Sequence, residues 1–206
     1  MSDDPRPTPA GHPPAAPVDP SPTSPEARPP GRSAAVGDPG FVDAYRGLAA
    51  EISRGVAVLT CLRAGKPQAI TVDSFLDVSW DPPTMAVSVY SGSRMMEALE
   101  RADSWALSVL SAQQKGTAQW LGEPGQPLHG VLDPVPTFRS PGGLPIVAEA
   151  PVWFELALTQ RLEVATHTLI VGEVRTCGTA GTRGTGRPLI RFGEGYGTFA
   201  PRAGSS

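Results

Sequence analysis

The chain has 206 residues, among them 24 prolines and two cysteines, and its 17 basic and 20 acidic side chains give a formal net charge of −3. Nucleic-acid-binding surfaces are basic and a membrane span needs roughly 18 consecutive apolar residues, so this composition predicts neither a nucleic-acid partner nor a membrane span. Because the N-terminus is acidic and proline-rich and lacks the apolar core of a signal peptide, we expect a cytoplasmic protein.

Proline dominates the beginning of the chain. Twelve of the 24 prolines lie within residues 1–40, where hardly any apolar side chain is larger than valine. Such a segment cannot bury enough surface to offset the entropy of ordering it. We predict a disordered, partly polyproline-like tail over 1–40; the alternative is that "PRPTP" is a ligand for a proline-recognising module. The rest predicts one domain over 41–201 and a frayed C-terminus over 202–206.

The first elements of this domain are predicted from hydrophobic spacing. "FVDAYRGLAAEIS" (41–53) has helical spacing, with an apolar stripe of Phe41, Tyr45, Leu48, Ala49 and Ile52. "GVAVLTCLRAGKPQAITVDSF" (55–75) predicts two strands joined by a turn at "RAGKP". "DPP" (81–83) predicts the next turn and "TMAVSVY" (84–90) the next strand.

A second helix is predicted from Ser93, its N-cap, with Met95, Met96 and Leu99 facing inward. A strand (104–112), a short helix (113–122) and a long proline-broken loop (123–143) follow. The strongest strand is "PVWFELALTQRLEV" (151–164), in which Val152, Phe154, Leu156, Leu158, Leu162 and Val164 keep period two. "HTLIVGEVRTC" (167–177) is expected to return beside it, and "PLIRF" (188–192) and "GYGTF" (195–199) to close the domain.

Many strands, few helices and no regular alternation of the two predict a mainly β, antiparallel barrel. "GTRGTG" and "GEGYG" do not stand between a strand and a helix, so we interpret them as turns and reject a dinucleotide-binding Rossmann fold. Cys61 and Cys177, each in an apolar run, are expected to be buried thiols. The cysteines and His12, His129 and His167 have no metal-ligand spacing, so no metal site is expected.

Three polar residues interrupt the predicted hairpin at its end. Burying Thr71, Asp73 and Ser74 without partners would cost a few kcal/mol each, so they face either water or a polar ligand in a cleft. The sequence contains no nucleophile elbow, zinc-protease motif or cysteine near a histidine. Polar groups without acid–base machinery favour an enzyme whose chemistry is supplied by a cofactor.

The segment from Gly55 to Leu99, together with "WALSVLSAQQ" and "THTLIVGEV", resembles the flavin reductase-like family of FMN-binding split-barrel proteins. The shared features are T-x-x-S-F, the DPP turn, the S-R helix start and H-T-L-x-x-G-x-V, in the family's order. The resemblance implies an antiparallel, Greek-key-like split β-barrel and a homodimer. It also implies that NADH or NADPH reduces FMN or FAD, which a partner monooxygenase would use.

The resemblance also implies site residues. Thr71, Val72, Asp73, Ser74 and Phe75 would lie along the isoalloxazine ring; Ser91, Ser93 and Arg94 would bind the flavin phosphate; Ser111 and Gln114 match a further contact region; Tyr196 would lie near the pocket; His167 would position the nicotinamide. A helix N-terminus beside an arginine also suits a phosphate on physical grounds.

Simpler interpretations remain for these residues. Thr71 and Ser74 would then face solvent from an edge strand, Ser93 would only cap a helix that begins with a solvated Arg94, and His167 would be an edge-strand residue. Three positions depart from the family pattern: Asp73 replaces an asparagine, Thr166 stands where the aspartate of a G-D-H segment would be, and Leu128 replaces an aromatic residue. Because a carboxylate near the ring would oppose its reduction, we predict that Asp73 points away from the flavin.

Two alternative functions follow from the same barrel. One is a flavin- or haem-binding module without turnover, and the other is an enzyme similar to pyridoxamine-phosphate oxidases, which would need more basic residues around the phosphate than Arg94.

Overall fold

The structure is a computed structural model that describes residues 33–127, 130–181 and 187–199. Most of the predicted tail and all of 202–206 lie outside the described residues; those of 33–40 are exposed. The helices are α1 (Phe41–Ala50), α2 (Arg94–Leu99), the 3₁₀ turn η1 (Ala112–Gln114) and α3 (Lys115–Gly122). The strands are β1 (Arg54–Gly55), β2 (Ala57–Arg63), β3 (Lys66–Val72), β4 (Phe75–Trp80), β5 (Pro83–Tyr90), β6 (Ser104–Val109), β7 (Thr137–Arg139), β8 (Pro145–Val147), β9 (Val152–Val164), β10 (His167–Gly178), β11 (Leu189–Phe192) and β12 (Gly195–Thr198).

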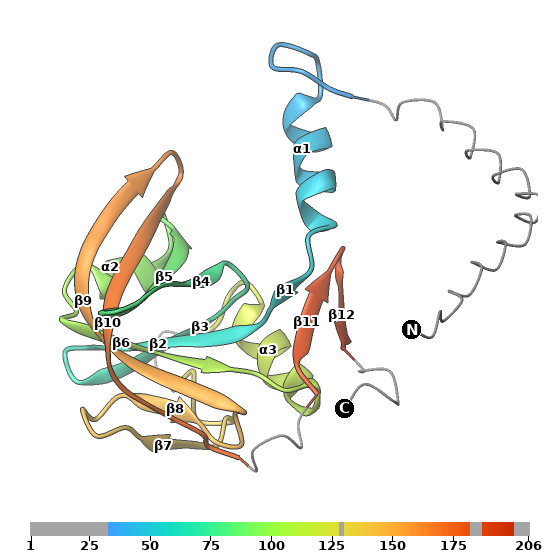
Figure 1. The fold of residues 1–206 in the computed structure, drawn as a ribbon. Helices are drawn as coiled ribbons and strands as arrows, with labels where there is room; N and C mark the ends of the chain where they lie inside the picture. The colour runs from blue at the N-terminus through green and yellow to red at the C-terminus, as the bar shows by residue number, and fades with distance from the viewer. Residues whose placement is uncertain (1–32, 128–129, 182–186, 200–206) are drawn as a thin grey trace, which may run out of the picture.

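The main sheet has seven strands in the order β3-β2-β6-β9-β10-β5-β4, and every pair in it is antiparallel (Figure 1). A smaller sheet, β1-β11-β12, joins an early strand to the last two, and β7 and β8 form a separate hairpin. The expected mainly β, antiparallel architecture is therefore confirmed. β2 and β3 are joined by Ala64 and Gly65, both with positive φ, the geometry of a two-residue hairpin turn.

The strand β2 is buried on both faces. Ala57, Leu59 and Cys61 belong to the larger core cluster, which the inward side of α2 completes. Val56 and Val58 point the other way into a second cluster that α3 covers. This two-sided burial explains why β2 is a continuous apolar run in the sequence rather than an alternating one.

The helix α2 forms as predicted. Ser93 caps it by accepting a hydrogen bond from the backbone N–H of Met96 at 3.1 Å, and Met95, Met96 and Leu99 are buried. Among the described residues, no helix is long and apolar enough to cross a membrane.

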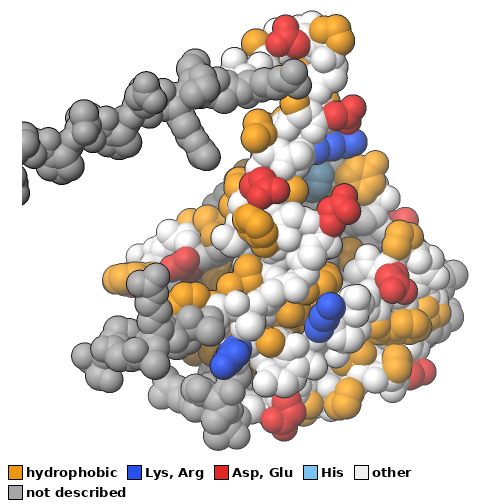
Figure 2. Space-filling model, turned by 90° about the vertical axis from the view of Figure 1, so that its right-hand side faces the viewer, with side chains coloured by type: hydrophobic (Ala, Val, Ile, Leu, Met, Phe, Trp, Pro, Cys, Tyr) orange, Lys and Arg blue, Asp and Glu red, His pale blue; other side chains and the backbone are white. Residues whose placement is uncertain are grey.

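Four expectations were wrong in detail. The opening helix ends at Ala50, and none of its ten residues is buried, because α1 stands away from the sheet (Figures 1 and 2). The loop 123–143 contains β7. Beyond Leu158, β9 projects past the core as a long hairpin with β10, so Leu162 and Val164 are exposed. Cys177 is exposed on β10, whereas Cys61 is buried as expected.

Candidate functional site

The predicted site segment 71–75 lies where β3 ends and β4 begins. The Thr71 hydroxyl donates to the carbonyl of Ala118 at 2.8 Å, which ties the segment to α3, and Val72 is buried in the core. Phe75 packs its ring against the same core and against Gly55. The bend at Asp73 and Ser74 is therefore the polar part of the segment that remains available to a ligand.

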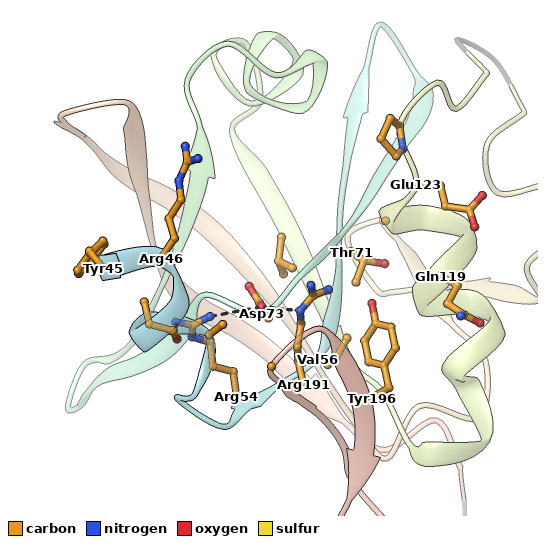
Figure 3. A pocket seen from close by; sticks show the side chains of 16 residues that line it. Tyr45, Arg46, Arg54, Val56, Thr71, Asp73, Gln119, Glu123, Arg191 and Tyr196 are labelled. Atoms are coloured by element: carbon orange, nitrogen blue, oxygen red, sulfur yellow. Dashed lines mark hydrogen bonds and ion pairs between the residues drawn. The ribbon is translucent and has the colours of Figure 1, made fainter. Parts of the chain in front are cut away.

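Asp73 is turned toward two arginines. Its Oδ2 lies 3.7 Å from Nη1 of Arg54 and 3.8 Å from Nε of Arg191 (Figure 3), and the Ser74 hydroxyl donates to its Oδ1 at 3.3 Å. Arg54 comes from β1 and Arg191 from β11, both in the small sheet. The carboxylate is thus held by groups outside the main sheet.

A cavity of about 320 Å³, here called the sheet cleft, opens where the ends of β3 and β5 meet α2 and the start of β10. It brings together six of the predicted site residues, Thr71, Val72, Asp73, Ser74, Ser93 and His167, with Ser88 and Tyr90. An adjoining hollow of about 440 Å³ shares Asp73, Ser74 and Ser88 with it.

The start of α2 borders the sheet cleft and a second cavity of about 420 Å³, the α2 cavity, which Arg94 also lines. Arg94 Nη2 donates to the carbonyl of Gln126 at 2.8 Å. The Ser91 hydroxyl lies 3.0 Å from that of Thr168 on β10, and the Ser91 N–H donates to the carbonyl of Thr166 at 3.0 Å. The two Ser91 bonds join the turn before α2 to the start of β10, but Ser91 lines none of the cavities described here and Arg94 lines only the α2 cavity.

His167 begins β10, opposite Tyr90 of β5 in the antiparallel register. The two rings meet edge to face, with centroids 5.7 Å apart, and the Thr166 hydroxyl lies 3.0 Å from Nδ1 of His167. Either the hydroxyl or the ring nitrogen can be the donor in this contact, depending on the tautomer of His167. The imidazole of His167 is thus contacted by the uncharged hydroxyl of Thr166, at the position where the family pattern has an aspartate.

Besides Phe75, Ser91 and Arg94, three further predicted residues do not line the sheet cleft. Ser111 and Gln114 form a capping box with each other at η1, and Gln114 Nε2 donates to the carbonyl of Ala148 at 2.8 Å. Neither lines a cavity that contains the 71–75 segment. Tyr196 lines a different cavity, described next.

This cavity, the arginine cavity, has a volume of about 700 Å³ and lies between α1, α3 and the small sheet (Figure 3). Its lining includes Arg54, Asp73, Arg191 and Tyr196. The sequence does not point to Arg54 and Arg191, because single arginines in short strands carry no periodic signal. Only the register shows that they stand directly opposite each other.

Comparison with known proteins places this geometry in context. A family model described as "Flavin reductase like domain" matches residues 49–200. The NADH-dependent flavin reductase StyB of Pseudomonas fluorescens is 34% identical over 155 residues, which is 74% of this chain and 86% of that protein.

Two solved structures have the same fold. The NADH:FAD oxidoreductase SgcE6 of Streptomyces globisporus, in complex with NAD and FAD fragments, has a TM-score of 0.73 at 27% identity, covering 82% of this chain and 99% of that one. The styrene monooxygenase flavin reductase of Pseudomonas putida S12 has a TM-score of 0.67 at 31% identity, covering 76% and 97%. The fold is therefore the split barrel of these reductases.

Proposed function

Because this chain belongs to the flavin reductase-like family, we propose that it reduces FMN or FAD with NADH or NADPH as the hydride donor. The observation that carries the proposal is the sheet cleft, in which six residues predicted for flavin and nicotinamide binding line one cavity.

The donors around this cleft fit a flavin. The sheet cleft and its adjoining hollow are lined mostly by strand residues, and Ser74 and Ser88, which carry hydroxyl groups, line both. Ser93 and Arg94 supply hydroxyl and guanidinium groups at the other end, which suits a phosphate. A flavin has the same polarity, with a polar ring edge and a phosphate on its side chain.

The bound flavin would supply the hydride acceptor, and the residues of this chain bind and orient the two substrates. Ser74 and the backbone N–H groups of the 73–75 bend would donate to the polar edge of the ring, where negative charge develops. Arg94 would bind the phosphate, and His167, through its Nε2, would hold the nicotinamide within reach of the ring. Asp73 lines the sheet cleft, and its ion pairs with Arg54 and Arg191 support the prediction that its carboxylate would point away from the ring.

The test is to follow NADH and NADPH absorbance in air with the full chain and FMN, FAD or no flavin. Absorbance decay that depends on added flavin supports the proposal. Its rates also show whether the chain prefers FMN or FAD, and NADH or NADPH. Retained flavin without decay would contradict it and favour the alternative of a non-catalytic flavin-binding module, whereas a haem spectrum would favour the haem-binding one.

We further propose that the reduced flavin passes to a flavin-dependent monooxygenase. The relative from Pseudomonas putida S12 is named as the flavin reductase of a styrene monooxygenase. Oxygenation of a substrate by a candidate monooxygenase, supplied with NADH, flavin and this chain, is the corresponding assay. We also propose a cytoplasmic location, which accords with Cys61 and Cys177 being free cysteines.

A homodimer is also proposed, and the outward face of the main sheet supports it. In the β9–β10 pair, Leu162 lies opposite Leu169 and Val164 lies opposite His167. On its other side, His167 lies opposite Tyr90 of β5. Leu162, Val164 and Tyr90 are 46%, 52% and 57% exposed beside the sheet cleft. A second copy on this face would cover exposed apolar surface and close the cleft.

Light scattering tests the dimer. We expect the full chain to have twice the monomer mass and Leu162→Asp to have the monomer mass. Val36→Asp, which changes an exposed apolar residue that precedes α1, is the matched control and should remain dimeric. A wild-type chain of monomer mass would contradict the proposal.

A further inference from the structure

We propose that the arginine cavity binds the diphosphate bridge of a dinucleotide through the guanidinium groups of Arg54 and Arg191. The proposal rests on the proposed flavin reduction, since it assigns a place to the part of a substrate that lies outside the sheet cleft. Its ligand chemistry is a diphosphate ester, which reduced pyridine nucleotides and FAD both carry.

The arginine cavity adjoins the sheet cleft. The two share Thr71, Val72 and Asp73 and no other lining residue, so the 71–73 segment is their common wall. A mononucleotide held in the sheet cleft leaves the arginine cavity, of about 700 Å³, to a second group. A dinucleotide with its reactive ring in the cleft can continue past Asp73 into this space.

The charge of the cavity is positive although the chain carries a net charge of −3. Arg46, Arg54 and Arg191 line it, against Asp73 and Glu123 (Figure 3). Arg54 and Arg191 are directly opposite in the β1–β11 pair, an arrangement in which like charges repel. The carboxylate of Asp73 balances only one of these two guanidinium charges. The remaining positive charge favours an anionic ligand.

The two guanidinium groups are held in place and keep free donors. Arg54 Nη2 donates to the carbonyl of Ala49 at 2.7 Å, and Arg191 lies over the ring of Tyr196, 5.7 Å from its centroid. The contacts with Asp73, at 3.7 and 3.8 Å, are ion pairs that lack a hydrogen bond. With the described residues, the Arg191 side chain forms no hydrogen bond at all. Its planar fork suits bidentate binding of a phosphate.

The experiment uses the full chain and its Arg191→Gln and Arg54→Gln variants, with FMN as the flavin, so that NADH is the only diphosphate ester present. We expect KM for NADH to rise about tenfold or more and kcat to change less than about twofold. Arg191→Lys, which keeps the charge and loses the fork, should recover part of the affinity. Arg175→Gln removes an arginine paired with Glu173 at 2.8 Å, away from the cavity, and should leave KM unchanged.

Further measurements identify the source of the diphosphate. If KM for NADH is unchanged but the Kd of FAD rises and that of FMN does not, the cavity binds FAD. If none of these constants changes in variants that melt at the wild-type temperature, the proposal is overturned. A wild-type chain without NADH oxidation would refute the proposed function alone. In that case, calorimetry with inorganic pyrophosphate tests the diphosphate site. Binding to the full chain that is lost in Arg191→Gln would support the site, and no binding to the full chain would overturn it.

Discussion

At the scale of single residues, the arginines of the candidate site lie in two separate places. Arg94 starts α2 and lines the α2 cavity, whereas Arg54 and Arg191 flank Asp73 in the arginine cavity, and Arg54 also lines the hollow beside the sheet cleft. Ser74 lines the sheet cleft and its adjoining hollow, and its hydroxyl donates to Asp73 at 3.3 Å, a long contact that a closer acceptor on a ligand can replace. The side chains therefore define two anion-attracting ends with a neutral polar middle.

Arg94→Ala should weaken FMN binding about tenfold, because a charge-assisted contact with the phosphate is lost. Riboflavin lacks the phosphate, so its affinity should not change. Both dissociation constants can be measured by flavin fluorescence. Arg63→Ala, which removes an arginine bonded to Glu97 of α2 at 3.0 Å, is the matched control. An equal loss of FMN and riboflavin affinity would show that Arg94 does not bind the phosphate.

The Cys61 thiol predicts a pH dependence of stability. Burial raises the pKa of Cys61 from 9.0 to about 12, so the unfolded chain loses this proton before the folded chain does. Stability present below pH 9 should therefore fall as the pH rises from 9 to 12, by at most about 1.4 kcal/mol per pH unit. Urea unfolding of the wild type and Cys61→Ala at pH 8, 9 and 10 measures it. The same decline in both proteins would exclude Cys61 as the cause.

At the scale of elements, the strands nearest the core leave no room for additional atoms. A Cβ on Gly172 of β10 would lie 2.8 Å from Nε1 of Trp105 and 2.9 Å from Cβ of Leu156. The glycine is thus required where β10 crosses the indole of β6. Elements farther from the core, such as α1 and the end of the β9–β10 hairpin, are not packed in this way.

Gly172→Ala should lower the free energy of unfolding by about 1–3 kcal/mol through overpacking. Gly197→Ala on β12 is its control, since a Cβ there meets nothing within 4 Å. Chemical denaturation of both variants measures the difference. Equal stabilities would mean that the Trp105 side chain moves aside without cost.

Sequence patterns predicted the elements whose burial follows from local spacing. The β2–β3 hairpin and α2 with its Ser93 cap formed as expected, because turn residues and caps act within a few positions. Local periodicity did not show that α1 would be unpacked or that β9 would extend beyond the core. The arginine cavity was missed for the same reason, because it depends on the long-range pairing of β1 with β11.

At the scale of the whole molecule, we propose that residues 41–201 form the catalytic domain. The described residues before α1 are exposed, and the family match begins at residue 49. A chain that starts at Phe41 should therefore keep the wild-type melting temperature and flavin-dependent NADH oxidation, both measured against the full chain. Loss of either would mean that residues 1–40 contribute to the fold or to the reaction.

The pairing of β1 with β11 also sets an order of events on the ribosome. β1 leaves the exit tunnel early, but its partner is made only after the seven strands of the main sheet have been synthesised. Arg54 therefore has no partner strand until the segment with Arg191 has been synthesised, and the arginine cavity is completed last. A nascent chain arrested before β11 would already contain every strand of the main sheet and still lack one wall of the arginine cavity.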